Sequence, residues 1–183
     1  MKNFVSKPIF LVYTYLLAVV LVLNSRPTSS WLECKNETMQ SPIDLAFSKM
    51  QYAPELGDLQ LNYTPASAIL KNRGHDISWA VAGSAGSIQI DGITYVLDQI
   101  HWHSPSEHTI NGRRFALEQH LVHKNVQLQK VVVVAVLYAT SIFKNPFLSK
   151  LEGSIMDISG IGASEVNVGL VDPNDIDMSD RRY

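Results

Sequence analysis

The sequence predicts a mainly β protein, built on a twisted and largely antiparallel central sheet with short helices at its periphery. Three observations predict this class. Short runs rich in β-branched and aromatic residues recur along the chain and are separated by turn residues. Two of these breaks, Asp91-Gly92 and Asn111-Gly112, are typical of two-residue β-hairpins. The run from Lys130 to Tyr138 is apolar after its first residue, which is typical of a strand buried on both faces.

The expected elements follow in order along the chain. We expect strands at residues 60–63, 68–71, 77–81, 88–90, 93–103, 114–123 and 130–138. Asn145 and Pro146 are typical of the cap and the first residue of a helix, which we expect to end near Met156.

The N-terminus is typical of a secretory leader. Lys2 and Lys7 accompany an uncharged apolar run from Ile9 to Leu23, which is slightly short for a membrane span. We assign residues 1–29 to a signal peptide and residues 30–183 to one partial domain, with a retained signal anchor as the alternative. We therefore expect a secreted chain with no membrane attachment after signal removal, or else one that reaches a plastid by the secretory route.

Charge and cysteine content narrow the possible partners. The net charge of −2 gives no electrostatic reason to expect binding to nucleic acid or to an anionic membrane. Cys34 is the only cysteine, so we expect a free thiol or a dimer linked through Cys34. Asn36 and Asn62 each begin an Asn-x-Thr triplet and are candidate glycosylation sites.

Three histidines form a candidate metal site. Residues two apart in a strand point the same way, so alternation from Tyr95 places Leu97, Gln99, His101 and His103 on one face, with the two histidines about 6–7 Å apart. A strand that returns after Asn111-Gly112 could bring His120 opposite them. Three imidazoles with an open fourth position are typical of a catalytic zinc site.

Two further residues are placed to orient these histidines. Gln99 lies two residues before His101, and Glu118 lies two residues before His120. Histidine ligands usually donate their second N–H to an amide oxygen, a carboxylate or a carbonyl. We therefore expect Gln99 and Glu118 to fix the two imidazoles.

Each histidine taken alone has a simpler interpretation without a metal. A single strand histidine is more often a satisfied core or surface residue, and His-x-His alone is a weak signal. The third histidine, with Gln99 and Glu118 at matching positions, favours metal. A structural zinc site is disfavoured because no fourth protein ligand is evident.

This stretch resembles the zinc segment of α-class carbonic anhydrases, in the form found in plant members. The resemblance runs from Cys34 to the C-terminus and includes the segments QSPIDL (residues 40–45) and GHDISW (residues 74–79). It implies a small-molecule substrate and zinc-dependent, reversible hydration of carbon dioxide to bicarbonate and a proton by zinc-bound hydroxide.

The resemblance also implies roles for single residues. His75, which residue type alone would make a surface loop histidine, would shuttle protons to solvent. Glu107 would accept a hydrogen bond from a threonine beside the hydroxide, and Val122 and Val136 would line the substrate pocket. His108 and His123 are expected to be structural and are excluded from the metal set.

The chain also departs from the family pattern. It ends at Tyr183, before the Leu-Thr-Thr-Pro-Pro-Cys segment that supplies the threonine and the downstream cysteine that members pair with the equivalent of Cys34. We therefore expect carbon dioxide hydration impaired by truncation. The alternative is a non-catalytic, secreted relative that keeps a zinc-binding or protein-binding surface.

Overall fold

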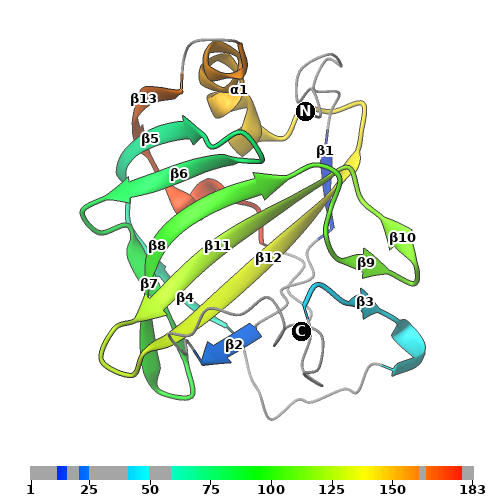
Figure 1. Ribbon diagram of the computed structural model, residues 1–183, viewed down its shortest axis with the longest axis vertical. Coiled ribbons are helices and arrows are strands. Elements are labelled where there is room, and N and C mark those ends of the chain that lie inside the picture. The colour runs from blue at the N-terminus through cyan, green and yellow to red at the C-terminus, as the bar shows by residue number, and fades with distance from the viewer. Residues whose placement is uncertain (1–11, 16–20, 25–40, 50–58, 161–163, 179–183) are drawn as a thin grey trace.

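A strongly curled ten-stranded sheet dominates the molecule (Figure 1). The computed structural model describes residues 12–15, 21–24, 41–49, 59–160 and 164–178. Within them the strand order is β1-β12-β11-β8-β6-β5-β13, while β2 pairs with β12 and β7 joins β4 to β8. Every pair in this sheet is antiparallel, which confirms the predicted fold class.

In the main sheet the strands agree with the predicted ones within a few residues, except for three that were not predicted, β1, β2 and β13. The strands of the main sheet are β1 (Val12–Tyr15), β2 (Leu21–Asn24), β4 (Gln60–Tyr63), β5 (Ala66–Asn72), β6 (Ile77–Ala82), β7 (Gly86–Ile90), β8 (Ile93–His103), β11 (Leu117–Asn125), β12 (Lys130–Thr140) and β13 (Glu165–Val171). A second, three-stranded sheet lies beside it and consists of β3 (Asp44–Leu45), β9 (Thr109–Ile110) and β10 (Arg113–Arg114).

Both predicted hairpin turns are present. Asp91 and Gly92 have φ values of 50° and 74°, and Asn111 and Gly112 have values of 48° and 73°. Positive φ at both central residues is what a type I′ turn requires. The second turn joins β9 to β10, so the strand predicted at residues 114–123 is divided between the short β10 and the longer β11.

One predicted feature of β8 is wrong. The ladder between β8 and β11 shifts register at Asp98, so that Gln99 is paired with Val122 while Leu97 is paired with His123. Such a bulge reverses which face the side chains occupy. Tyr95 and Leu97 therefore lie in the hydrophobic core with Ile100 and Trp102, and do not share a face with the histidines.

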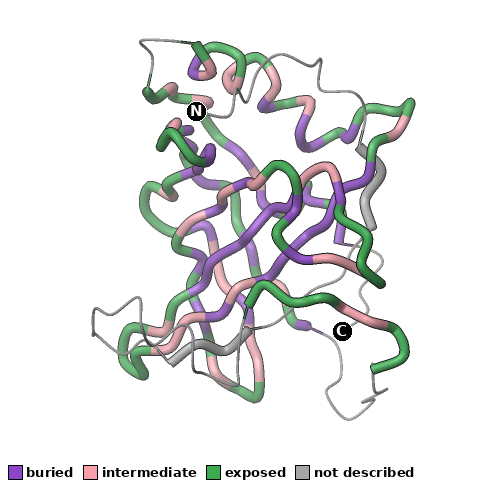
Figure 2. The backbone as a smooth tube through the Cα atoms, turned by 45° about the vertical axis from the view of Figure 1, so that its right-hand side comes forward, coloured by how far each residue is buried: buried purple, intermediate pink, exposed green. Residues whose placement is uncertain are grey.

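The main core lies on the sheet face opposite the histidines. The helix α1 (Pro146–Ser159) packs against β5 and β13 and contributes Phe147, Leu151 and Ile158 to this core. Asn145 caps the helix by accepting a hydrogen bond from the N–H of Leu148 at 3.0 Å, as predicted, although the helix runs three residues beyond Met156. Figure 2 shows the buried backbone concentrated in the centre of the sheet and the exposed backbone in its turns.

Several predictions fall on the N-terminal region. β1 and β2 lie within the segment assigned to a signal peptide, and both pair with β12. Cys34 and Asn36 lie outside the described residues. No helix in the described ranges is long and apolar enough to cross a membrane.

Candidate metal centre

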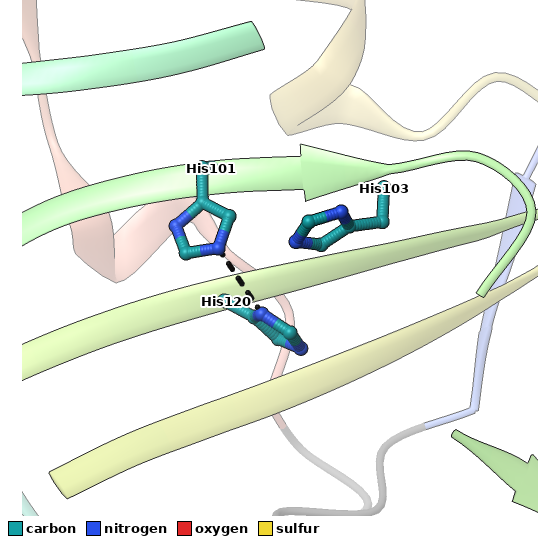
Figure 3. Close-up of side chains that lie close together, drawn as sticks. All are labelled: His101, His103 and His120. Carbon is teal, nitrogen blue, oxygen red and sulfur yellow. Dashed lines mark hydrogen bonds between the residues drawn. The ribbon is translucent and has the colours of Figure 1, made fainter. Parts of the chain in front are cut away.

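Strand pairing brings the three predicted histidines together on one face of the sheet. His101 and His103 lie near the end of β8, and His120 lies on the neighbouring strand β11. The register places His120 directly opposite His101, and Glu118 opposite His103. Because directly opposed residues of an antiparallel pair share a face, all three imidazoles project from the same side (Figure 3).

The imidazoles are close enough to share one ion. Their ring centroids are separated by 4.9 Å for His101 and His103, and by 5.0 Å for each of these with His120. Nε2 of His101 lies 3.2 Å from Nδ1 of His120. One nitrogen from each ring lies within 4.8 Å of the other two, and three imidazole nitrogens suit Zn²⁺. The residues present therefore fit a zinc ion.

Glu118 connects His120, His108 and the backbone of residues 107 and 108 through hydrogen bonds. Its Oε1 lies 2.6 Å from Nε2 of His120 and 2.5 Å from Nδ1 of His108, and its Oε2 accepts from the backbone N–H groups of Glu107 and His108, at 2.8 Å each. Burial alone would raise the pKa of Glu118. The hydrogen bonds from the two histidines and the backbone outweigh burial and hold that pKa well below its usual range. The ionised carboxylate of Glu118 holds the Nε2 side of His120, and Nδ1 of His120 faces the other two imidazoles. Glu118 therefore makes the contact with His120 that its position in the sequence predicts.

Burial keeps His101 neutral. It lowers the pKa of His101 to about 4, and the neighbouring His120 and His103 act in the same direction. Burial likewise lowers the pKa of His103. Neutral imidazoles are the form that binds a metal ion, so both rings are ready to act as ligands at neutral pH.

The predicted contact between Gln99 and His101 is not formed. Oε1 of Gln99 instead lies 3.5 Å from Nη1 of Arg73, and Nδ1 of His101 is buried without a hydrogen-bond partner among the described residues. The cause is a residue that the sequence did not single out. Arg73 is held beside Gln99 by Asp76, whose carboxylate binds its guanidinium.

His108 and His123 are occupied by internal hydrogen bonds, in agreement with the structural roles expected of them. Nε2 of His108 lies 3.1 Å from the hydroxyl of Ser41, and its other nitrogen contacts Glu118. Nε2 of His123 lies 2.9 Å from the hydroxyl of Tyr63, and the two rings stack. His108, Glu118 and His120 are also close enough to suggest a metal cluster, but their separations of 2.5 and 2.6 Å are those of hydrogen bonds.

Glu107 and His75 lie at the edges of the site. Oε2 of Glu107 is 3.6 Å from Nε2 of His103, and the Glu107 side chain is partly exposed. His75 lies in the turn between β5 and β6 with 73% of its side chain exposed, and its Nε2 is 3.5 Å from Oδ2 of Asp76. Glu107 therefore contacts a candidate ligand directly, whereas His75 faces solvent.

Of the two predicted pocket valines, Val122 lies on the histidine face of the sheet and Val136 does not. Val136 is paired with Gln119, belongs to the main core and faces away from the histidines. Val122 lies on the histidine face, and its partner across the β11–β12 ladder is the partly buried Val133. Residues 131–134 are all valines, so their sequence does not indicate which face of the sheet each side chain occupies. The strand register alone shows that Val133 lies on the histidine face.

Comparison with known proteins agrees with this geometry. The profile of the eukaryotic-type carbonic anhydrase family matches residues 26–182. Alpha carbonic anhydrase 7 of Arabidopsis thaliana is 46% identical over 153 residues, which are 84% of this chain and 55% of that protein. Dioscorin DB3S of Dioscorea polystachya is 43% identical over 155 residues, which are 84% of this chain and 56% of that protein.

Solved structures show the same likeness. The crystal structure of a dioscorin complexed with ascorbate has a TM-score of 0.77 and 42% identity, covering 82% of this chain and 62% of that one. The alpha-carbonic anhydrase of Photobacterium profundum has a TM-score of 0.68 and 31% identity, covering 80% and 64%. The chain thus spans little more than half the length of the two curated relatives above. Its sequence and its curled sheet place it in the eukaryotic-type, or alpha, carbonic anhydrase family.

Proposed function

We propose that this chain is a zinc-dependent carbonic anhydrase, which catalyses the reversible hydration of carbon dioxide to bicarbonate and a proton. The observation that carries the proposal is the convergence of three imidazoles, with centroids 4.9–5.0 Å apart, on one sheet face. His101, His103 and His120 would hold the ion, and zinc held in this way supplies Lewis-acid activation of water at neutral pH.

Other residues of the chain would orient a metal ligand, line the substrate pocket and carry protons to solvent. Glu118 fixes His120 through Oε1 and anchors the loop that carries Glu107 through Oε2. Val122 and Val133 form an apolar strip beside the histidines, against which an uncharged gas molecule can rest. The imidazole of His75 is largely exposed to solvent, as the role of a proton shuttle requires.

Metal analysis combined with stopped-flow carbon dioxide hydration tests this function. We expect the purified chain to bind up to one zinc per molecule and to accelerate hydration, and His120→Ala to lose both properties. Equal zinc in the two proteins would overturn the ligand assignment. Zinc bound without any acceleration would overturn the catalytic proposal alone.

A second candidate is a non-catalytic, carbonic anhydrase-related domain that binds zinc or another protein. The observation that favours it is the position of Glu107, whose carboxylate contacts Nε2 of His103. A carboxylate so close to a candidate ligand nitrogen competes with the substrate for the open side of the site. Dioscorins, one of which is solved with ascorbate, are relatives at similar identity to the named carbonic anhydrases.

Secretion, glycosylation and dimer formation through Cys34 remain proposals. Asn62 is exposed on β4, so an oligosaccharide transferase could reach it in a secretory compartment. Expression in a secretory host, followed by glycosidase treatment and non-reducing mass spectrometry, distinguishes a glycan at Asn62 from one at Asn36. The same spectra show whether Cys34 is free or linked to a second chain.

A further inference from the structure

A tight turn carries charged residues to the rim of the histidine site. The turn joins β5 to β6, and the N–H of Arg73 donates to the carbonyl of Asp76 at 3.0 Å within it. Ser78 on β6 lies opposite His101. Asp76 precedes Ser78 by two residues, so it lies on the same side of the sheet as the three imidazoles.

Arg73 is held in one orientation by Asp76. Its Nε donates to Oδ1 of Asp76 at 2.6 Å, and its Nη2 donates to Oδ2. The Asp76 side chain is only 2% exposed, so this ion pair is largely shielded from water. The hydrogen bonds that Arg73 donates to Asp76 raise the pKa of Arg73, which therefore stays charged.

The other edge of the guanidinium remains available. A guanidinium can bind planar oxyanions through the Nε–Nη2 edge or through the Nη1–Nη2 edge, and Asp76 occupies only the first. On the second edge, the one contact within the described part of the chain is the long one of 3.5 Å from Nη1 to Oε1 of Gln99. About a third of the Arg73 side chain, 36%, is exposed to solvent.

We propose that the Nη1–Nη2 edge of Arg73 is an oxyanion-binding element of this site, which holds a small planar anion, bicarbonate, beside the three histidines. The proposal rests on the proposed function, because bicarbonate is the product of that reaction. Gln99, which Nη1 contacts, precedes His101 by two residues on β8. An anion that displaced this long contact would therefore lie beside Gln99, about 6–7 Å along β8 from His101.

The ion pair also determines how Arg73 acts. Because Asp76 neutralises its charge, Arg73 would bind an anion through two directed hydrogen bonds rather than by long-range attraction. A lysine has the same charge but lacks the fork, so Arg73→Lys should not preserve binding. This separates the proposal from a simple effect of positive charge.

Bicarbonate titration of the ¹⁵N-labelled, zinc-supplied chain tests the proposal. The backbone amide signals of residues 72–76 are followed by NMR at constant ionic strength, with chloride as the reference anion. We expect Arg73→Leu to raise the Kd for bicarbonate at least about tenfold, because one of the two hydrogen bonds to a charged group already accounts for that factor, and Arg73→Lys to raise it several-fold. Lys71→Met is the matched control, because Lys71 lies two residues away and pairs on the surface with Glu165.

Arg73→Leu leaves a buried carboxylate unpaired, which can destabilise the fold. The double variant Arg73→Leu with Asp76→Asn removes both charges and should show the same weak binding in a folded chain, checked by circular dichroism. Unchanged Kd values in the Arg73 variants, an equal loss in Lys71→Met, or no bicarbonate binding by the unaltered chain would each overturn the proposal. Carbon dioxide hydration by the unaltered chain is measured separately and decides the proposed function on its own.

Discussion

At the scale of single residues, Glu118 connects more of the site than any predicted ligand does. It accepts hydrogen bonds from two imidazoles and two backbone N–H groups, and it is completely buried. Its position two residues before His120 predicted one of these contacts. The other three depend on the loop at residues 104–108, whose path the spacing of residues in the sequence does not specify.

A buried histidine away from the metal site predicts how stability depends on pH. Burial lowers the pKa of His123 to about 4, against an ordinary value of 6.5. Between these two pH values the unfolded chain binds a proton that the folded chain does not, so stability should be complete above pH 6.5 and fall as the pH drops towards 4. The difference corresponds to roughly 3 kcal/mol, and neutral His101 acts in the same direction.

Urea unfolding at several pH values, with a chelator present, measures this dependence. His123→Phe should make the fall in unfolding free energy between pH 6.5 and 4 smaller. Tyr63→Phe removes the hydroxyl that contacts His123 but keeps the histidine, so it should retain the full pH dependence. An equally steep fall in His123→Phe would show that His123 does not titrate in this way.

At the scale of elements, bulges and close approaches set the geometry of the sheet. The register shift at Asp98 turns His101 and His103 to the face opposite Tyr95 and Leu97. Simple alternation along β8 predicts that the two histidines project together, because both follow the bulge. Alternation fails for the residues before the bulge. The added residue keeps the period of two on each side, but residues before it and residues after it point to opposite faces of the sheet.

The pairing of β4 with β7 requires glycine at residue 86. Gly86 has a φ of 94°, and a Cβ there would lie 2.1 Å from the carbonyl oxygen of Asn62. Gly86→Ala should therefore force the two strands apart and cost several kcal/mol of unfolding free energy. Gly92→Ala is the matched control: Gly92 also has positive φ, at 74°, but open space around it, so about 1–2 kcal/mol is expected. Equal losses in chemical denaturation would show that β4 and β7 do not approach as closely as described.

At the scale of the whole molecule, the histidine site links metal binding to folding. The three ligands come from two strands, and their nitrogens converge only when β8 and β11 are paired. Zinc that binds the folded chain in preference to the unfolded chain should stabilise it by about 2.7 kcal/mol when free zinc is a hundredfold above the Kd.

Thermal unfolding with and without zinc measures this linkage. For a chain of this size, the expected stabilisation corresponds to a rise in Tm of roughly 5–10 °C. His101→Ala removes one ligand and should abolish most of the rise, while a chelator should reverse it in the unaltered chain. A similar rise in His101→Ala would mean that zinc binds elsewhere.

The sequence by itself determined the fold class, most strands, both hairpin turns, the cap at Asn145 and the three histidines, because each depends on the local period of two or on a turn within a few residues. Only the tertiary structure decided which distant residues surround the histidines. In the folded chain Val136 lies in the core, and Val133 lies beside Val122 on the histidine face. The register between β12 and β11 determines which face of the sheet each side chain of β12 occupies. In the folded chain Gln99 also contacts Arg73 rather than His101. Asp76 holds the guanidinium of Arg73 in place, and Arg73 lies 26 residues before Gln99 in the chain. Periodicity defines how side chains alternate within one strand, but contacts between strands follow from registers and bulges that only the folded sheet fixes.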